Sequence, residues 1–222
     1  ELGNVLTSDG KVHRVVFIGT GKYLETNDLT DTQQQTLYAI KDDDTPTSAV
    51  TAALINPRAS TASPNRMVQQ TITGGTDNRT VTTVTSTNKT DFKVDRGWFV
   101  DFPDSGEREN VAMQLVLGTL IVPTTVPSST VCEPGGRGWL NFFNYQTGGP
   151  VTNTNIVSTS MTAPIVGINV MYVVDPGTGK LVPKVSAVGA NDPTPKLVPD
   201  TPFSGTGSGF QKKRAIWREL VQ

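Results

Sequence analysis

The chain has 222 residues, of which 36% are hydrophobic and 18% are charged, so it can bury a sizeable core as one domain or as part of a larger one. Its 19 lysine and arginine residues nearly balance 20 aspartate and glutamate residues, which argues against a nucleic-acid partner or an anionic membrane surface. Thirty-two threonines and 26 valines favour strands, while 21 glycines and 15 prolines favour turns, so a helical bundle is excluded.

Short apolar runs, alternating or β-branched and each followed by turn residues, predict eight strands. They lie at residues 12–18, 36–40, 98–102, 111–117, 120–125, 139–143, 165–174 and 180–188. Residues 175–179, between the last two runs, predict a hairpin turn. Residues 47–56 have helical spacing before Pro57 and predict one short helix.

Two segments repeat one pattern of strand, polar excursion, aromatic strand and turn. The first copy comprises residues 15–20 and 36–42, and the second comprises residues 120–125 and 138–144. This order of strand, polar loop, aromatic strand and turn is typical of four-stranded propeller blades of about 40–50 residues, so the repeat predicts blades of a β-propeller. Residues 57–96 are rich in threonine and break the spacing, which predicts an inserted hairpin or long loop.

The chain has one cysteine, Cys132, and one histidine, His13. Cys132 has no partner for an internal disulfide and no neighbouring base to activate its thiol, and His13 has no second imidazole with which to share a zinc ion. No apolar run approaches the roughly twenty residues of a membrane-spanning helix. The chain opens on Glu1 without a methionine or a leader, which predicts a processed product or an excised piece with no transmembrane segment.

Three glycine-rich segments match no phosphate-binding or nucleophile motif. Residues 19–24 place Leu24 where the dinucleotide fingerprint needs its third glycine, and residues 177–180 lack the upstream glycine and the Ser or Thr of a P-loop. Both are expected to be turns in which glycine supplies a positive φ. Residues 205–209 lack the Gly-x-Ser-x-Gly order and are expected to form a flexible tail linker.

Acidic residues raise calcium binding and glycoside hydrolysis as alternatives. The candidate calcium ligands lack the spacing that wraps one ion, so solvated turn carboxylates are the simpler interpretation. These candidates are Asp28, Asp31, Asp42, Asp43 and Asp44. A second group, which gathers around Pro103 and Gly106, predicts a structural clamp, with paired-carboxylate chemistry as a remote alternative. Its members are Asp101, Asp104, Glu107 and Arg108.

The three tryptophans, Trp98, Trp139 and Trp217, could stack on a ligand, but each lies in or beside an apolar run. Packing between sheets is therefore the better interpretation. The sequence offers no credible set of nucleophile, base and metal ligands, so no catalytic, cofactor-binding or metal-binding residue is assigned and the protein is predicted not to be an enzyme.

Five stretches in this order resemble the C-terminal β-propeller of the PilY/PilC-type type IV pilus biogenesis and tip adhesin proteins. They are residues 16–24, 28–42, 97–103 with 106–108 (Gly-Trp-Phe-Val-Asp-Phe-Pro and Gly-Glu-Arg), 124–127 with 132–140, and the tail 214–220. The chain departs from the family at residues 143–148, where a Leu-Asp-x-x-Thr-Gly turn is usual, and in the length of residues 45–95. The calcium loop that the resemblance implies has no match here, so Ca²⁺ is expected at a loop upstream of residue 1.

The resemblance implies an all-β, quinoprotein-like propeller with an incomplete ring, residues 1–204 forming its C-terminal part and residues 205–222 a tail or closing strand. It implies a non-enzymatic surface protein, at the pilus tip or the outer-membrane surface of a Gram-negative bacterium, that supports pilus extension against retraction and contributes to adhesion. Its implied partners are minor pilins or the tip complex, the upstream part of the same polypeptide, and a host or surface ligand. A quinoprotein-like dehydrogenase fragment and a secreted β-sandwich remain the alternatives.

Overall fold

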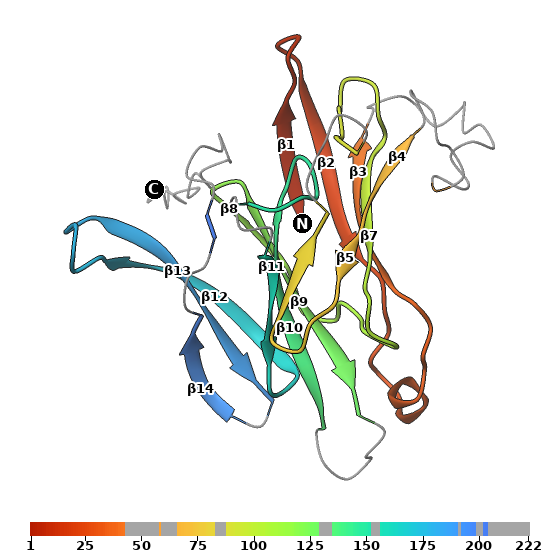
Figure 1. Ribbon diagram of the computed structural model, residues 1–222, viewed down its shortest axis with the longest axis vertical. Coiled ribbons are helices and arrows are strands. Elements are labelled where there is room, and N and C mark those ends of the chain that lie inside the picture. The colour runs from red at the N-terminus through yellow and green to blue at the C-terminus, as the bar shows by residue number, and fades with distance from the viewer. Residues whose placement is uncertain are drawn as a thin grey trace, which may run out of the picture.

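The computed structural model describes residues 1–42, 58, 66–82, 88–128, 135–151, 156–190, 192–198 and 202–203. Over these ranges the chain has fourteen strands, one short 3-10 helix and no α-helix, which confirms the predicted all-β class. The strands form three sheets (Figure 1). Within the same ranges, no helix has the length and apolar character needed to cross a membrane.

The first sheet has the strand order β1-β2-β3-β7-β4. Strands β1 (Leu2–Leu6), β2 (Val12–Gly19) and β3 (Thr36–Asp42) form an antiparallel meander, and β7 (Gly97–Asp101), which follows three intervening strands in the chain, pairs antiparallel with β3. β4 (Met67–Gln70) pairs in parallel with β7 at the edge of the sheet. The 3-10 helix η1 (Thr26–Leu29) lies in the connection between β2 and β3.

The second sheet has the order β5-β6-β11-β10-β9-β8 and repeats the meander of the first. Its four meander strands are β8 (Gln114–Val116), β9 (Thr119–Pro127), β10 (Gly136–Asn144) and β11 (Ile156–Met161). β6 (Asn78–Val81) pairs with β11, and β5 (Ile72–Thr73) pairs with β6. The two segments that repeat in the sequence thus form β2–β3 and β9–β10, the second and third strands of the two meanders.

The third sheet has three antiparallel strands, β12 (Ile165–Val174), β13 (Leu181–Gly189) and β14 (Asp192–Leu197). The predicted hairpin joins β12 to β13, and its tip projects from the rest of the molecule (Figure 1). Asp175 stabilises the turn, because its Oδ1 accepts hydrogen bonds from the backbone N–H groups of Gly177 and Thr178 at 3.0 and 2.7 Å. These contacts hold the pKa of Asp175 below its ordinary value.

Two apolar clusters hold the three sheets face to face. The first cluster joins residues of the first and second sheets, such as Phe17, Trp98 and Phe143, and the second joins the second and third sheets. Along β9, Leu120 and Val122 enter the first cluster and Ile121 enters the second. Because both faces of the second sheet are covered, β9 is a nearly continuous apolar run.

Strands β1–β3 of the first sheet, β8–β11 of the second and β12–β14 of the third follow one another in the chain, as in propeller blades. Between β3 and β8 the chain passes back and forth between the first two sheets, because β4 and β7 lie in the first sheet and β5 and β6 lie in the second. The described strands do not close into a ring, so the fold is consistent with an incomplete propeller-like stack. The segment predicted as an insertion supplies β4, β5 and β6. Only Thr71 separates β4 of the first sheet from β5 of the second, so this segment links the two sheets at their edges.

The sequence predictions missed β1, β4, β11 and β14, and predicted a longer β8 than the structure has. β14 carries Pro193 and Pro195, which argue against a strand in sequence but are compatible with its place at the edge of a sheet. The predicted helix at residues 47–56 lies outside the described residues.

Candidate functional site

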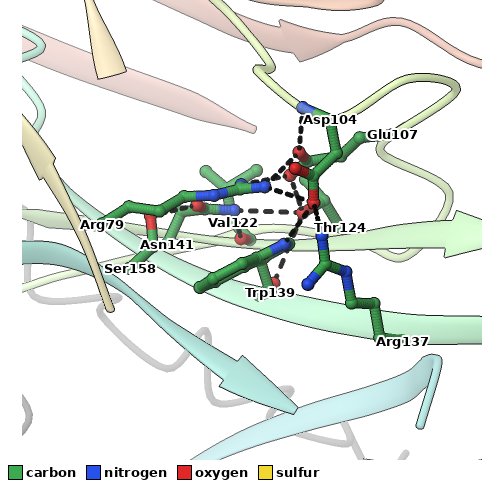
Figure 2. Close-up of polar contacts among 9 residues, drawn as sticks. All are labelled: Arg79, Asp104, Glu107, Val122, Thr124, Arg137, Trp139, Asn141 and Ser158. Atoms are coloured by element: carbon green, nitrogen blue, oxygen red, sulfur yellow. Dashed lines mark hydrogen bonds and ion pairs between the residues drawn. The ribbon is translucent and has the colours of Figure 1, made fainter. Parts of the chain in front are cut away.

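Eight polar and aromatic side chains form a buried polar network on the face of the second sheet that looks toward the first (Figure 2). They are Arg79, Asp104, Glu107, Thr124, Arg137, Trp139, Asn141 and Ser158. Six come from β6, β9, β10 and β11, while Asp104 and Glu107 come from the loop between β7 and β8. The strand register brings the six to one place, because Asn141 lies opposite Ser158 and Trp139 lies opposite Thr124.

Arg79 is the centre of the network. Its Nη1 donates to Glu107 Oε1 at 2.9 Å, and its Nη2 lies 2.9 Å from Glu107 Oε2 and 2.6 Å from Asp104 Oδ2. The guanidinium carbon lies 3.7 Å from the ring centroid of Trp139. The side chains of Arg79 and Glu107 have no exposed surface, so their charges are compensated inside the protein by bidentate pairing and by the indole face.

Asp104 connects the buried part of the network to solvent. Its Oδ2 accepts hydrogen bonds from Trp139 Nε1 at 2.8 Å and from Arg137 Nη2 at 2.7 Å. The Asp104 and Arg137 side chains are 22% and 45% exposed, and Arg137 also lies over the Trp139 ring, on which Arg79 stacks. Two arginines and two carboxylates therefore balance to zero formal charge around one tryptophan.

Three neutral side chains extend the network across the sheet. Thr124 Oγ1 donates to Glu107 Oε1 at 2.6 Å, and Asn141 Nδ2 donates to Thr124 Oγ1 at 3.2 Å and to the Val122 carbonyl at 2.9 Å. Ser158 Oγ donates to Asn141 Oδ1 at 2.5 Å. The Ser158 hydroxyl is therefore bonded to an amide oxygen and not to a base, so it is not activated as a nucleophile.

Arg108 forms a second buried clamp beside the network. Its Nε and Nη2 donate to the carbonyls of Gly106 at 2.8 Å and of Asp31 at 2.7 Å, and its Nη1 donates to the Lys22 carbonyl. A Cβ on Gly21 would lie 2.3 Å from Arg108 Cβ, and Gly21 has a φ of +136°. Residues 20–24 therefore pack against Arg108 as an irregular loop with no assigned turn, and Gly21 is required there by the close approach and the positive φ.

The four clustered residues around Pro103 and Gly106 do not act as one group. The expected Glu107–Arg108 pair is not formed, because Glu107 binds Arg79 and Arg108 binds backbone carbonyls. Asp101 belongs to a third cluster, in which its Oδ1 accepts from Thr36 Oγ1 at 2.6 Å and its Oδ2 from Arg58 Nη2 at 2.6 Å. Because Glu107 is fully buried and paired with arginine, it cannot serve with Asp104 as a carboxylate pair for a sugar.

The described calcium candidates are turn or pairing carboxylates. Asp28 Oδ2 accepts the backbone N–H groups of Leu24 at 2.7 Å and Glu25 at 2.9 Å, which holds the pKa of Asp28 below its ordinary value. Asp31 accepts from the Gln33 N–H at 2.9 Å, and the carboxylate of Asp42 lies 3.3 Å from Arg14. Across the described ranges, no three Asp, Glu, His or Cys side chains gather as metal ligands.

Trp98 packs between the first and second sheets, as predicted. Its ring centroid lies 6.2 Å from that of Phe17 and 6.0 Å from that of Phe143, and its Nε1 donates to the Tyr145 carbonyl at 3.1 Å. Trp139 is equally buried but lies in the polar network. The other candidates, namely Asp43, Asp44, Cys132, Trp217 and residues 205–209, lie outside the described residues.

The sequence did not point to Arg79. This arginine lies in a threonine-rich segment, and its buried position depends on the pairing of β6 with β11, which brings together distant parts of the chain. The one available signal is the alternation Asn-Arg-Thr-Val in β6, where Arg79 and Val81 share the buried face.

The fold and its buried clamps define an all-β protein of stacked, propeller-like meanders. Over its whole length the chain is 27% identical, across 235 aligned residues, to the Type IV pilus biogenesis factor PilY1 homolog of Xylella fastidiosa (strain Temecula1). This similarity confirms the resemblance to PilY1-type proteins predicted from the sequence motifs. The chain spans 17% of the length of that relative. No family model and no solved structure matches the chain.

Proposed function

We propose that the chain is part of a non-enzymatic surface protein of the type IV pilus system, which supports pilus assembly and extension against retraction and contributes to adhesion at the pilus tip. The observation that carries this proposal is the similarity of the whole chain to a pilus biogenesis factor. The polypeptide would lie outside the cell, on the pilus or the outer-membrane surface, where minor pilins and a host or surface ligand are its partners.

The architecture supports a binding and mechanical role. The first and second sheets share an apolar cluster, and β4 and β5 link their edges. The buried polar network ties the loop between β7 and β8 to the second sheet. Among the described side chains, the buried carboxylates are paired or hydrogen-bonded, and none is placed beside an activated nucleophile. A rigid scaffold of this kind transmits load and presents loops to partners.

The first sheet supports the proposal that further sheets of the same polypeptide precede residue 1. Its inner face is covered by the second sheet, but its outer face exposes Leu2, Leu6, Val12, Ile18 and Ile40, which are 37–63% exposed. Cross-strand pairing places these five apolar side chains on one face. The chain spans only 17% of its relative, and the family resemblance implies that the remaining polypeptide lies upstream, so the proposed occupant of this face is an upstream sheet of the same architecture.

The calcium ion implied by the resemblance does not fit the described residues. Asp28 uses its Oδ2 for backbone N–H groups, and no metal-ligand cluster forms among the residues that the structure describes. A calcium loop upstream of residue 1 therefore stays a prediction. No observation here favours the quinoprotein alternative over the pilus role, and dye-linked dehydrogenase activity of the purified protein would support that alternative.

The test is genetic. The coding region for this chain is deleted in the source bacterium, and surface pili are counted by electron microscopy with the retraction motor present and absent. The proposal expects few pili when the motor is present and recovery of pili when it is absent, together with reduced surface attachment. An unchanged number of pili in the motor-containing strain would overturn the proposal.

A further inference from the structure

The strand β12 has an open edge. It pairs with β13 on one side, and no described residue pairs with its other side. The tip of the β12–β13 hairpin projects beyond the remaining sheets (Figure 1). Val170 still packs against the second apolar cluster, whereas Tyr172 and Val174 nearer the tip are exposed. At the beginning of the strand the edge is closed, because Gln114 Nε2 donates to the Ile168 carbonyl at 3.2 Å.

The register identifies the backbone groups on the open edge. The Asp175 N–H donates to the Lys180 carbonyl at 2.8 Å, so these two residues form a hydrogen-bonded pair. Bonded and non-bonded pairs alternate along an antiparallel ladder, so the pairs of Tyr172 with Pro183 and of Val170 with Val185 are non-bonded. The N–H and C=O groups of Val170, Tyr172 and Val174 therefore point away from β13.

Pro183 and the Ile168 carbonyl support this assignment independently. A proline has no N–H, so Pro183 fits a position that makes no bond to β12. Ile168 is two residues before Val170 and has the same orientation, and its carbonyl indeed meets a partner on the open side. Three residues thus present a row of donors and acceptors without a partner among the described residues.

The side chains beside this edge are apolar and exposed. Tyr172 is 55% exposed and Val174 is 62% exposed, and β12 contains no charged residue and no proline. The opposite edge of the sheet is different, since β14 carries Pro193, Pro195 and Lys196, which are residues that protect an edge strand from pairing. Of the two edges of the third sheet, as far as the structure describes them, the β12 edge is the one with the properties of a template for another strand.

We propose that the open edge of β12 binds an extended, uncharged segment of a partner polypeptide by strand addition. The N–H and C=O groups of Val170, Tyr172 and Val174 pair with the partner's backbone, and apolar side chains of the partner cover Tyr172 and Val174. An uncharged segment fits this edge best, because β12 offers no charged side chain with which a charged residue of the partner could pair, and its exposed Tyr172 and Val174 favour apolar contacts.

The test uses the purified protein and a blocked synthetic peptide of alternating threonine and valine between terminal lysines. A second peptide of the same sequence carries N-methyl groups on its central amides and cannot donate hydrogen bonds. Binding is measured by fluorescence anisotropy. The proposal expects the unmodified peptide to bind, and expects N-methylation to weaken binding at least about tenfold. Equal binding of both peptides, or no binding of either, would overturn it.

Protein variants locate the site. Tyr172→Pro removes an N–H group that the β12–β13 ladder does not use, and it is expected to weaken peptide binding at least about tenfold. Val174→Asp is expected to weaken binding by the same factor, and it replaces the proline variant if that variant does not fold. The matched control is Leu197→Thr, at a 56% exposed apolar residue of β14, and its binding should stay within about twofold. Loss of binding in the control alone would refute the assignment. Dimerisation that Tyr172→Pro abolishes would instead make a second copy of the chain the occupant and overturn the proposed partner.

Discussion

Arg79 and Glu107 form a fully buried, two-point ion pair, with Nη1–Oε1 and Nη2–Oε2 distances of 2.9 Å each. This pair joins β6 of the second sheet to the loop that arrives from the first sheet. Strand β6 is therefore held in place in two ways, by strand pairing with β11 and by the ion pair between Arg79 and Glu107 of the β7–β8 loop.

Glu107→Ala is expected to lower the free energy of unfolding by about 3–5 kcal/mol, because it leaves the buried Arg79 with only part of its compensation. Replacing both residues by methionine should cost less than the sum of the single changes, since no charge then remains unpaired. Chemical denaturation measures both effects. The control is Arg14→Met, at a side chain 54% exposed, which should change stability by less than about 1 kcal/mol. A loss for Glu107→Ala no larger than the control's would contradict the account.

Arg108→Met is expected to loosen the loop between β2 and β3. The substitution removes three hydrogen bonds to backbone carbonyls from a charged donor, for a loss of about 2–4 kcal/mol in the free energy of unfolding. Arg108→Lys should recover only part of this loss, because an ammonium group cannot reproduce the planar fork. Hydrogen exchange should accelerate in residues 20–35. Unchanged exchange there would show that Arg108 does not hold the loop.

Gly97→Ala is expected to destabilise the first sheet by more than about 2 kcal/mol. Gly97 has a φ of +145°, and a Cβ at this position would lie 1.8 Å from the Ala39 carbonyl oxygen on β3. Gly74→Ala is the matched control, because a Cβ there meets no atom within 4 Å and its φ is not positive. The two variants are compared by thermal denaturation. Equal melting temperatures would show that β7 does not approach β3 as described.

Acid should weaken the η1 turn through Asp28. Because backbone N–H groups lower the pKa of Asp28 in the folded protein, the ionised side chain stabilises the fold above the unfolded-state pKa. This contribution is lost as the pH falls through the folded-state pKa. Between about pH 6 and about pH 3, the wild-type protein should therefore lose more stability than Asp28→Asn does. Parallel stability curves for the two proteins would exclude this role.

Sequence patterns predicted the strands whose apolar residues alternate or run continuously, including β2, β9 and β12. The missed strands lack such patterns for physical reasons. In β11, Ser158 faces the polar network, so the strand has little apolar alternation. The sequence repeat could be recognised because the β2–β3 pair and the β9–β10 pair each supply the second and third strands of a meander, and both pairs pack into the first apolar cluster.

The buried network was only half predictable. Glu107 is adjacent to a turn, and that context predicts a clamp with the neighbouring Arg108, whereas in the structure Glu107 binds a different arginine. Its partner Arg79 could not be identified, because the contact depends on the β6–β11 pairing between segments far apart in the chain. The sequence likewise could not separate Asp101 from Asp104, since only the fold sends these neighbours to different clusters.

The central claim is that the chain is a propeller-like stack whose first sheet is covered by a further sheet of the same polypeptide. It is tested most directly by thiol labelling of Ile18→Cys, a site 49% exposed in this chain, with Cys132 replaced by serine. Thr178→Cys at the hairpin tip is the control that should label equally in every context. The account predicts fast labelling of Ile18→Cys in the 222-residue chain, and labelling at least about tenfold slower when the natural upstream sequence is attached. Equal labelling rates in the two polypeptides would contradict it.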